Sequence, residues 1–505
     1  MQRRDFIKLA AASGTLASLG DLGFLSRLPL VSAADARVDA QRVRLHPDLE
    51  PTVRLLEETS AERVLEEVAA RIRRGLSYRD LIAALLLAGV RNIQPRPVGF
   101  KFHAVLVVNS AHLASLASPD SDRWLPIFWA IDQFKVSQAA DVRAGDWALG
   151  PVDEAAVPPS HKARDAFIAA MERWDEAPAD AAIAGLARTA GAHEIFQILA
   201  RYGARDFREI GHKEIYVANS FRLLEVIGWQ HAEPVLRSLA YALLDREGAR
   251  ENPATADLPA DRPYRHNREA VSRIRASWLE GRPGADATTE MLRTLRREPA
   301  QTASDKAVEL LNRGVAPRSI FDAFFECAAE LMMRAPGILS LHATTFTNAL
   351  HYAWRHCRDD ATRKLLLLQN AAFLPLFRGG VTRGVEIDAL EPVPLESSGP
   401  TAIEEIFAEI SRDRLTASRK ILAFLEDNPD PTPLADAARR LIFLKGVDSH
   451  DYKYSSAVLE DYAAMTPPRR DRFLAAAAFS LKGSADPDNP LVQRTRAVIQ
   501  PSPSR

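Results

Sequence analysis

The chain has 505 residues, of which 47% are hydrophobic and 26% charged, and its formal net charge is −1 at pH 7. This composition is typical of a globular protein, and the balanced charge gives no overall field that would favour nucleic acid or an anionic membrane. The balanced charge therefore predicts no nucleic-acid partner. No stretch after the N-terminus offers about eighteen uncharged apolar residues, so the sequence also predicts no transmembrane span.

The N-terminus carries a targeting pattern. Residues 2–8 read Q-R-R-D-F-I-K, a paired arginine followed by a phenylalanine, a hydrophobic residue and a lysine. This is the pattern of a twin-arginine signal. A weakly apolar stretch of small residues follows over 9–20, and small residues over 31–36 offer a cleavage site. We therefore expect residues 1–36 to be a signal peptide exported by the Tat translocase, and the mature chain to be periplasmic or secreted.

Helical periodicity dominates the mature chain. Apolar residues recur at three- and four-residue spacing over 61–74, 79–87, 183–187, 221–244, 307–311 and 320–333. The alternation typical of strands is scarce, and the one β-branched run, 105–108, lies in a segment whose other copy reads as helix. The predicted fold class is all-α, with stacked helical hairpins and internal repeats around a histidine-lined central pocket.

Proline, glycine and charge mark the expected boundaries. We expect a helical repeat domain over 37–380, with repeats at about 61–150, 180–246 and 300–380. Residues 381–400 would be a linker, 401–483 a C-terminal helical segment, and 484–505 a polar, flexible tail.

Two distant segments repeat each other. Residues 74–81 (R-G-L-S-Y-R-D-L) resemble residues 313–320 (R-G-V-A-P-R-S-I), and in both places a histidine follows the glycine by 28 residues. That histidine opens the motif H-A-x4-N-x2-H, at 103–112 and again at 342–351. A looser copy at 212–222 is one residue longer and ends in arginine instead of histidine. The repeated unit is a helix, a turn at glycine, a second helix and a histidine-led helix.

The motif constrains its own geometry. On a helix, the asparagine and the second histidine are three residues apart and share a face. The two histidines are nine residues apart, which places them on opposite faces of an unbroken helix. Either the first histidine precedes the helix, or the two histidines serve different surroundings.

Buried histidines and asparagines need partners, and repeated copies supply partners to one another. We expect the motif residues to meet in one polar pocket that binds a transition metal, since imidazoles suit iron, copper and zinc. The expected metal ligands are His103, His112, His212 and His351, and the expected pocket residues are Asn109, Asn219 and Asn348. The alternatives are proton transfer to an organic substrate, or separate structural roles in which each side chain caps or cross-links helices of its own repeat.

A second cluster, His450-Asp451-Tyr452-Lys453-Tyr454, opens a predicted helix after a break at 446–449. A histidine, an acid and a lysine at a helix start bind an anion or tune one another's protonation. The alternative is an ordinary helix cap by Asp448 or Ser449.

Cysteines are few. Cys327 and Cys357 are the only two, which excludes a zinc ribbon or an iron–sulfur cluster held by cysteines. An oxidising compartment permits a bond between them, and two buried thiols on neighbouring helices is the alternative.

The segments L-H-A-T-T at 341–345 with A-L at 349–350, and H-D-Y-K-Y at 450–454, resemble the questin oxidase-like family. The resemblance implies an all-helical oxidoreductase acting on aromatic polyketide-like molecules. It assigns catalytic roles to the matching positions His342, His450 and Lys453. Two features of this chain are not part of the resemblance: the export signal and the duplicated motif. Export argues against a soluble nicotinamide cofactor, because such cofactors are scarce outside the cytoplasm.

The leading hypothesis is an exported oxidoreductase that acts on a small organic substrate in a pocket of histidines and asparagines, with a bound metal. The chain has no G-x-G-x-x-G unit, Walker loop, G-x-S-x-G elbow or H-E-x-x-H motif. Two alternatives remain open: a non-catalytic helical-repeat binding protein, and a metal-dependent hydrolase.

Overall fold

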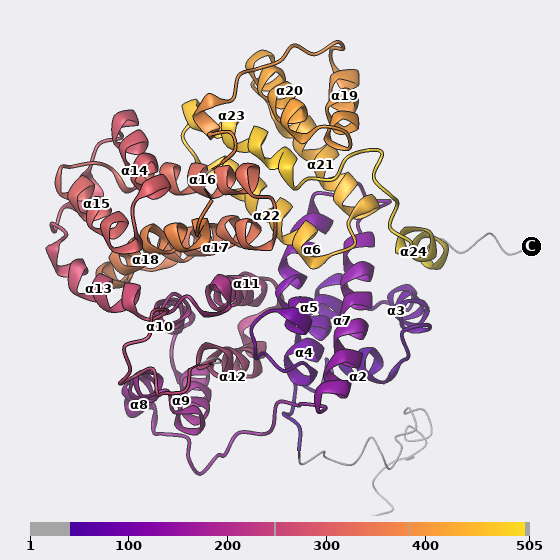
Figure 1. Cartoon of the computed structure of the whole chain (residues 1–505). Helices are drawn as coiled ribbons and strands as arrows, with labels where there is room; N and C mark the ends of the chain where they lie inside the picture. The colour runs from indigo at the N-terminus through magenta and orange to yellow at the C-terminus, as the bar shows by residue number, and fades with distance from the viewer. Residues whose placement is uncertain (1–40, 247–248, 382, 500–505) are drawn as a thin grey trace, which may run out of the picture. The chain divides into compact units, whose positions relative to one another are not determined.

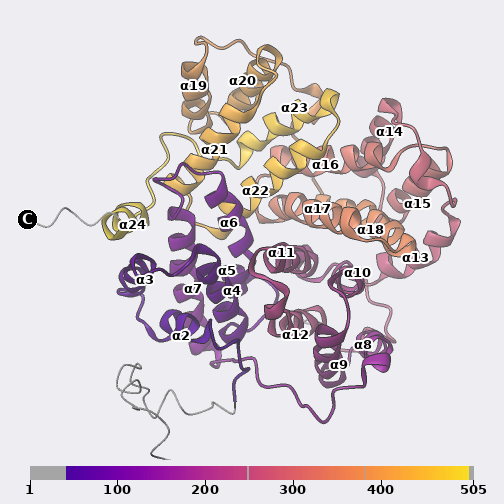
Figure 2. The same cartoon turned by 180° about the vertical axis from the view of Figure 1, so that it is seen from behind.

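The computed structural model describes residues 41–246, 249–381 and 383–499 (Figures 1 and 2). These residues form helices and no strand, and one isolated bridge joins Arg282 to Val315. The all-α prediction is confirmed, and the β-branched run at 105–108 is helical. The expected signal peptide, 1–36, lies outside the described residues. None of the described helices has the length and apolar character needed to cross a membrane.

Residues 43–499 belong to one packing unit. Its first part comprises α2 (Glu50–Glu58), α3 (Val64–Arg73), α4 (Tyr78–Asn92), the short 3₁₀ helix η3 (Phe100–Phe102), α5 (His103–Leu106), α6 (Val108–Leu116) and α7 (Leu125–Ala144). The next part comprises α8 (Ser160–Arg173), α9 (Glu176–Thr189), α10 (Ala192–Gly203), η4 (Arg208–Gly211), α11 (His212–Ile227), η5 (Trp229–His231) and α12 (Ala232–Leu243).

The third part comprises α13 (Arg262–Ala270), η6 (Val271–Arg273), η7 (Trp278–Glu280), α14 (Ala285–Arg297), α15 (Ala300–Asn312), α16 (Pro317–Arg334), α17 (Ile338–His356) and α18 (Asp360–Arg378). The last comprises η8 (Ile387–Ala389), α19 (Pro400–Ile410), α20 (Arg414–Asp427), α21 (Thr432–Lys445), α22 (Ser449–Ala464), α23 (Pro467–Ala476), η9 (Ala477–Phe479) and α24 (Leu491–Ile499).

The repeated glycines end equivalent helices. Gly75 follows α3 and Gly314 follows α15, and both adopt a positive φ, +104° and +90°. In each case the glycine N–H donates to the carbonyl three residues back, and the next N–H donates to the carbonyl five residues back. This Schellman motif requires a left-handed residue, for which glycine has no steric penalty. The two copies therefore share a turn as well as a sequence pattern.

Four helices form a closed ring in the core. Helix α6 packs against α11, α11 against α17, α17 against α22, and α22 against α6 (Figures 1 and 2). Helix α17 is buried along most of its length, and so are its neighbours α16 and α18. Because α22 follows the expected linker, a helix from the C-terminal segment completes the core of the repeat region.

The expected linker and tail are packed against the rest of the unit. Ile387 and Leu390 are buried, and the Ile387 N–H donates to Glu330 at 3.0 Å. In the expected flexible tail, α24 packs against α3 and α7. Val492 of α24 is buried and Arg494 is 2.8 Å from Glu66, so apolar packing and an ion pair together hold this segment. Residues 500–505 lie outside the described residues.

The two cysteines are buried and free, which answers the question the sequence left open in favour of thiols.

A buried ion pair fixes the start of α11. Lys213 Nζ is 2.8 Å from Asp206 Oδ2 and also donates to the carbonyl of Asp245, and both side chains of the ion pair are fully buried. Arg208 approaches the same carboxylate at 3.5 Å. A buried cation without its counter-ion is strongly destabilising.

We predict that Asp206→Ala lowers the free energy of unfolding by about 3–5 kcal/mol, because Lys213 is left buried and uncompensated. Chemical denaturation measures the change. The control is Asp165→Ala, whose side chain is 86% exposed and whose loss should cost less than about 0.5 kcal/mol. Equal stability of the two variants would contradict the role given to this pair.

Candidate metal site

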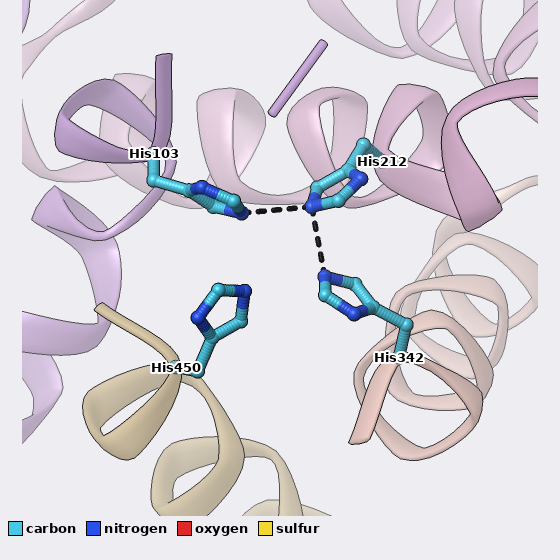
Figure 3. A group of neighbouring side chains, drawn as sticks. All are labelled: His103, His212, His342 and His450. Carbon is cyan, nitrogen blue, oxygen red and sulfur yellow. Dashed lines mark hydrogen bonds between the residues drawn. The ribbon is translucent and has the colours of Figure 1, made fainter. Parts of the chain in front are cut away.

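Four histidines meet where the helices of the ring begin. His103 starts α5, the short helix that leads into α6, His212 starts α11, His342 lies in the first turns of α17, and His450 lies in the first turn of α22. One ring nitrogen of each lies within 4.8 Å of those of the other three. Figure 3 shows the four rings directed at a common centre from four separate segments. The group can hold a metal ion.

Tight backbone turns place His103 and His212. Gly99 precedes η3 with φ +142°, and a Cβ there would lie 3.3 Å from His212 Cε1. Before His212, three successive residues (Glu209, Ile210 and Gly211) have positive φ, which is costly for the two that are not glycine. A Cβ on Gly211 would lie 2.5 Å from the Phe346 ring, so only glycine lets α11 approach α17 this closely.

Each histidine has its Nδ1 atom held by an oxygen. Nδ1 of His103 lies 2.9 Å from the carbonyl of Phe100, that of His212 lies 2.6 Å from the carbonyl of Glu209, and that of His342 lies 2.7 Å from the carbonyl of Ile338. His450 Nδ1 lies 2.5 Å from Asp448 Oδ1. Carbonyl and carboxylate oxygens only accept, so Nδ1 carries the proton in all four rings.

The Nε2 atoms therefore present lone pairs to one another. His212 Nε2 lies 2.8 Å from both His103 Nε2 and His342 Nε2. One ring nitrogen cannot donate in both contacts, and His450 Nε2 is buried without a hydrogen-bond partner among the described residues. A shared cation relieves this repulsion. Four imidazole nitrogens around zinc at about 2.0–2.1 Å would be roughly 3.3 Å apart, a value that lies between the 2.8 Å contacts and the 4.8 Å upper limit of the present spacing.

The arrangement has the outer support that metal-binding histidines need. In metal sites the second ring nitrogen usually donates to a carbonyl or carboxylate, which fixes the tautomer and the ring orientation. Asp448 supplies the carboxylate, and its hydrogen bond with His450 lowers the pKa of Asp448 to about 2. The same Asp448 caps α22 together with Asp451. The predicted helix cap is therefore present, and the same carboxylate also holds the His450 ring.

Burial keeps three of the four imidazoles neutral. Burial, reinforced by the nearby charge of Lys453, holds the pKa values of His103, His212 and His342 far below the usual range. Lys453 lies one turn after His450 on α22, and its Nζ is buried with no hydrogen-bond partner among the described residues. Burial lowers the Lys453 pKa to about 7. Neutral imidazole is the form that binds metals.

The asparagines form a second polar layer, further along the same helices. Asn219 Oδ1 lies 3.4 Å from Asn109 Nδ2 and 3.1 Å from Arg222 NH1. Asn348 Oδ1 accepts from Arg222 NH2 at 3.3 Å, while its amide donates to Glu460 at 3.1 Å and to Asp461 at 2.9 Å. The structure thus brings the three predicted pocket asparagines into one network, closed by a carboxylate pair from α22.

The structure does not bring His112 or His351 to the cluster. His112 Nδ1 lies 3.0 Å from the Tyr78 hydroxyl, and His112 lines a separate cavity. His351 packs among the rings of Phe321, Phe325 and Trp354. Both face away from the first histidine of their motif, as nine-residue helical spacing requires. The cluster takes its other two members from His342 and His450, which the sequence had marked as catalytic instead.

One pocket opens at the cluster, and a larger cavity lies elsewhere. A pocket of about 260 Å³ is lined by His103 and His450 together with Asp448 and the exposed Phe100. A larger cavity of about 620 Å³ lies between α6, α11, α21 and α22. An inner extension of about 20 Å³ shares Asn109, Arg222 and Glu460 with it and reaches Lys453. Lys453 thus lines a small cavity that shares residues with the large one, and its charge also acts on the histidines.

Sequence reasoning did not select Arg222, Asp448, Glu460 or Asp461 as site residues. Arg222 could have been identified from the repeat, because it stands where the other two copies of the motif have their second histidine. Glu460 and Asp461 could not have been identified in this way, because they lie in α22, outside the repeated segments.

Neither protein-family models nor curated proteins match this sequence, and no solved structure matches its fold.

We predict that His212→Ala abolishes metal binding, because His212 Nε2 contacts two other ligand nitrogens. His112→Ala and His351→Ala should keep full metal content per folded chain. Elemental analysis of the purified, folded variants measures this. Loss of metal from the His112 or His351 variant, with retention in the His212 variant, would contradict the assignment.

We also predict that Asp448→Asn weakens metal affinity about 10–100-fold, since the charged acceptor that orients His450 is lost. Competition with a chelator measures the affinity. Asp451→Asn is the matched control, because Asp451 shares the capping box but does not contact His450. If both variants lose affinity equally, the cap and not the imidazole contact is responsible.

Proposed function

We propose that the chain is an exported, metal-dependent oxidoreductase that acts on a small organic substrate. The observation that carries the proposal is the convergence of four Nε2 lone pairs whose Nδ1 protons are each held by oxygen. The metal would be held by His103, His212, His342 and His450.

The donor set favours redox chemistry over hydrolysis. Catalytic zinc commonly keeps three protein ligands and one open position, so four imidazoles would fill a tetrahedral zinc site. Iron accepts imidazole ligands and a higher coordination number, which leaves positions for an oxidant and a substrate. We therefore place iron first, ahead of copper and zinc.

The chain's own residues supply the remaining functions. The carbonyls and Asp448 hold the ligand tautomers, and the pocket lined by His103 and His450 gives small molecules access to the cluster. Lys453 lines the small inner cavity, and its Nζ is buried with no hydrogen-bond partner among the described residues, so it is available to hold a proton or donate a hydrogen bond to a ligand.

The questin oxidase-like resemblance supports the same reading. Its two short segments contribute His342, His450 and Lys453, and these three residues lie at one site although α22 is far from α17 in sequence. The resemblance would extend the substrate class to aromatic polyketide-like molecules.

The test is to purify the folded full chain and measure its metal content, its visible spectrum and its oxygen uptake with hydroxylated naphthoquinones and anthraquinones. We expect about one iron per chain and substrate-dependent oxygen uptake that His212→Ala abolishes. Stoichiometric zinc without oxygen uptake would favour a hydrolase. A chain that binds no metal would favour a non-catalytic binding protein.

Export has its own test. We predict that replacing both Arg3 and Arg4 by lysine keeps the protein in the cytoplasm, because the Tat pathway reads the arginine pair. Fractionation of cells followed by immunoblotting measures the distribution. Lys162→Arg, an exchange in helix α8 of the described chain, is the control and should leave export unchanged. Normal export of the twin-lysine variant would contradict the signal assignment.

A further inference from the structure

The large cavity has an apolar body and a charged inner end. Its apolar wall comes from α6, α11, α21 and α22, and includes Leu113, Val226, Ile442, Phe443 and Leu459. Arg222 and Glu460 line both this cavity and the small neighbouring cavity that Lys453 also lines. At about 620 Å³ it falls in the size range of small-molecule sites.

Arg222 is held rigidly. Its guanidinium donates to Asn219 Oδ1 at 3.1 Å and to Asn348 Oδ1 at 3.3 Å, and its Cζ lies 4.1 Å from the centre of the Tyr352 ring. The side chain is 11% exposed. Two amide acceptors and an aromatic face fix the guanidinium even when its acidic partner is removed.

Glu460 is held less tightly. It accepts from Arg222 NH2 at 2.8 Å through both oxygens and from the Asn348 amide at 3.1 Å, yet its side chain is 38% exposed. An exposed carboxylate returns to water at little cost, whereas the buried arginine does not. Glu460 is therefore the partner that can leave.

We propose that the cavity binds an organic carboxylate with an apolar body, whose carboxylate displaces Glu460 and pairs with Arg222. Arg222 NH2 already donates to both oxygens of the Glu460 carboxylate, so a ligand carboxylate can take over the same charged donor. The apolar part of the molecule then lies against the wall formed by α21 and α22. Such carboxylates would be the substrate class of the proposed oxidoreductase. Binding at Arg222 does not depend on that function, but oxidation of the bound molecule does.

The test is calorimetric titration of the metal-loaded full chain with 2-naphthoate and with its neutral analogue 2-naphthamide. We expect naphthoate to bind at least about tenfold more tightly, as charge-assisted hydrogen bonds predict. Arg222→Gln should remove this preference, and Arg439→Gln, at the same cavity but paired with Asp436, should retain most of it.

Glu460→Gln supplies a test that does not depend on a weakened variant. It keeps the size of the side chain and removes the competing charge, so naphthoate should bind several-fold more tightly while naphthamide is unaffected. If Arg222 and Glu460 form only a structural bridge, naphthoate affinity will not rise. That result, or equal binding of the two probes by the unmodified chain, would overturn the proposal.

The two proposals fail separately. The His212→Ala variant should still prefer naphthoate, because Arg222 does not contact the histidines. Arg222-dependent naphthoate binding by a chain that takes up no metal would refute the oxidoreductase and keep the carboxylate site. A metal-loaded chain that consumes oxygen but binds both probes equally would refute the carboxylate site alone.

Discussion

The site depends on one arrangement: four imidazoles whose Nδ1 protons are all held by oxygen and whose Nε2 lone pairs are therefore forced together. A buried lone pair without a donor or a cation is unfavourable, and here it occurs four times within 4.8 Å. Helices α6, α11, α17 and α22 hold the four imidazoles in place, because each helix contacts the next in a closed circle. Binding of a metal would turn this repulsion into the strongest link between the four segments.

The same ring explains why polar residues recur along these helices. The four segments run from the histidine layer toward the asparagine layer, so residues six or seven positions after each repeat histidine meet again around Arg222. In the middle copy an arginine stands where the other copies have a second histidine. That single difference makes the second layer a place for an anion, while the first layer is suited to a cation.

Much of this could be predicted from the sequence, within definite limits. Helical periodicity and the repeated glycines predicted the all-α fold, and Gly75 and Gly314 do end equivalent helices. Spacing alone also required the two histidines of each motif to face opposite ways, although it could not say which one faces the centre. The pairing of His450 with the repeat histidines was beyond reach, because it depends on α22 packing against α17 across the segment expected to be a linker. The helix α24 was not predicted because it is short and lies between polar, proline-containing stretches, although its apolar residues recur at helical spacing and pack against the core.

Coordination of a metal by the four histidines is tested most directly by X-ray absorption at the metal edge of the purified full chain. We expect a shell of four imidazole nitrogens at about 2.0–2.2 Å with no sulfur scatterer, since neither cysteine belongs to the histidine cluster. A shell dominated by carboxylate oxygen, with one imidazole or none, would rule out the four-histidine site.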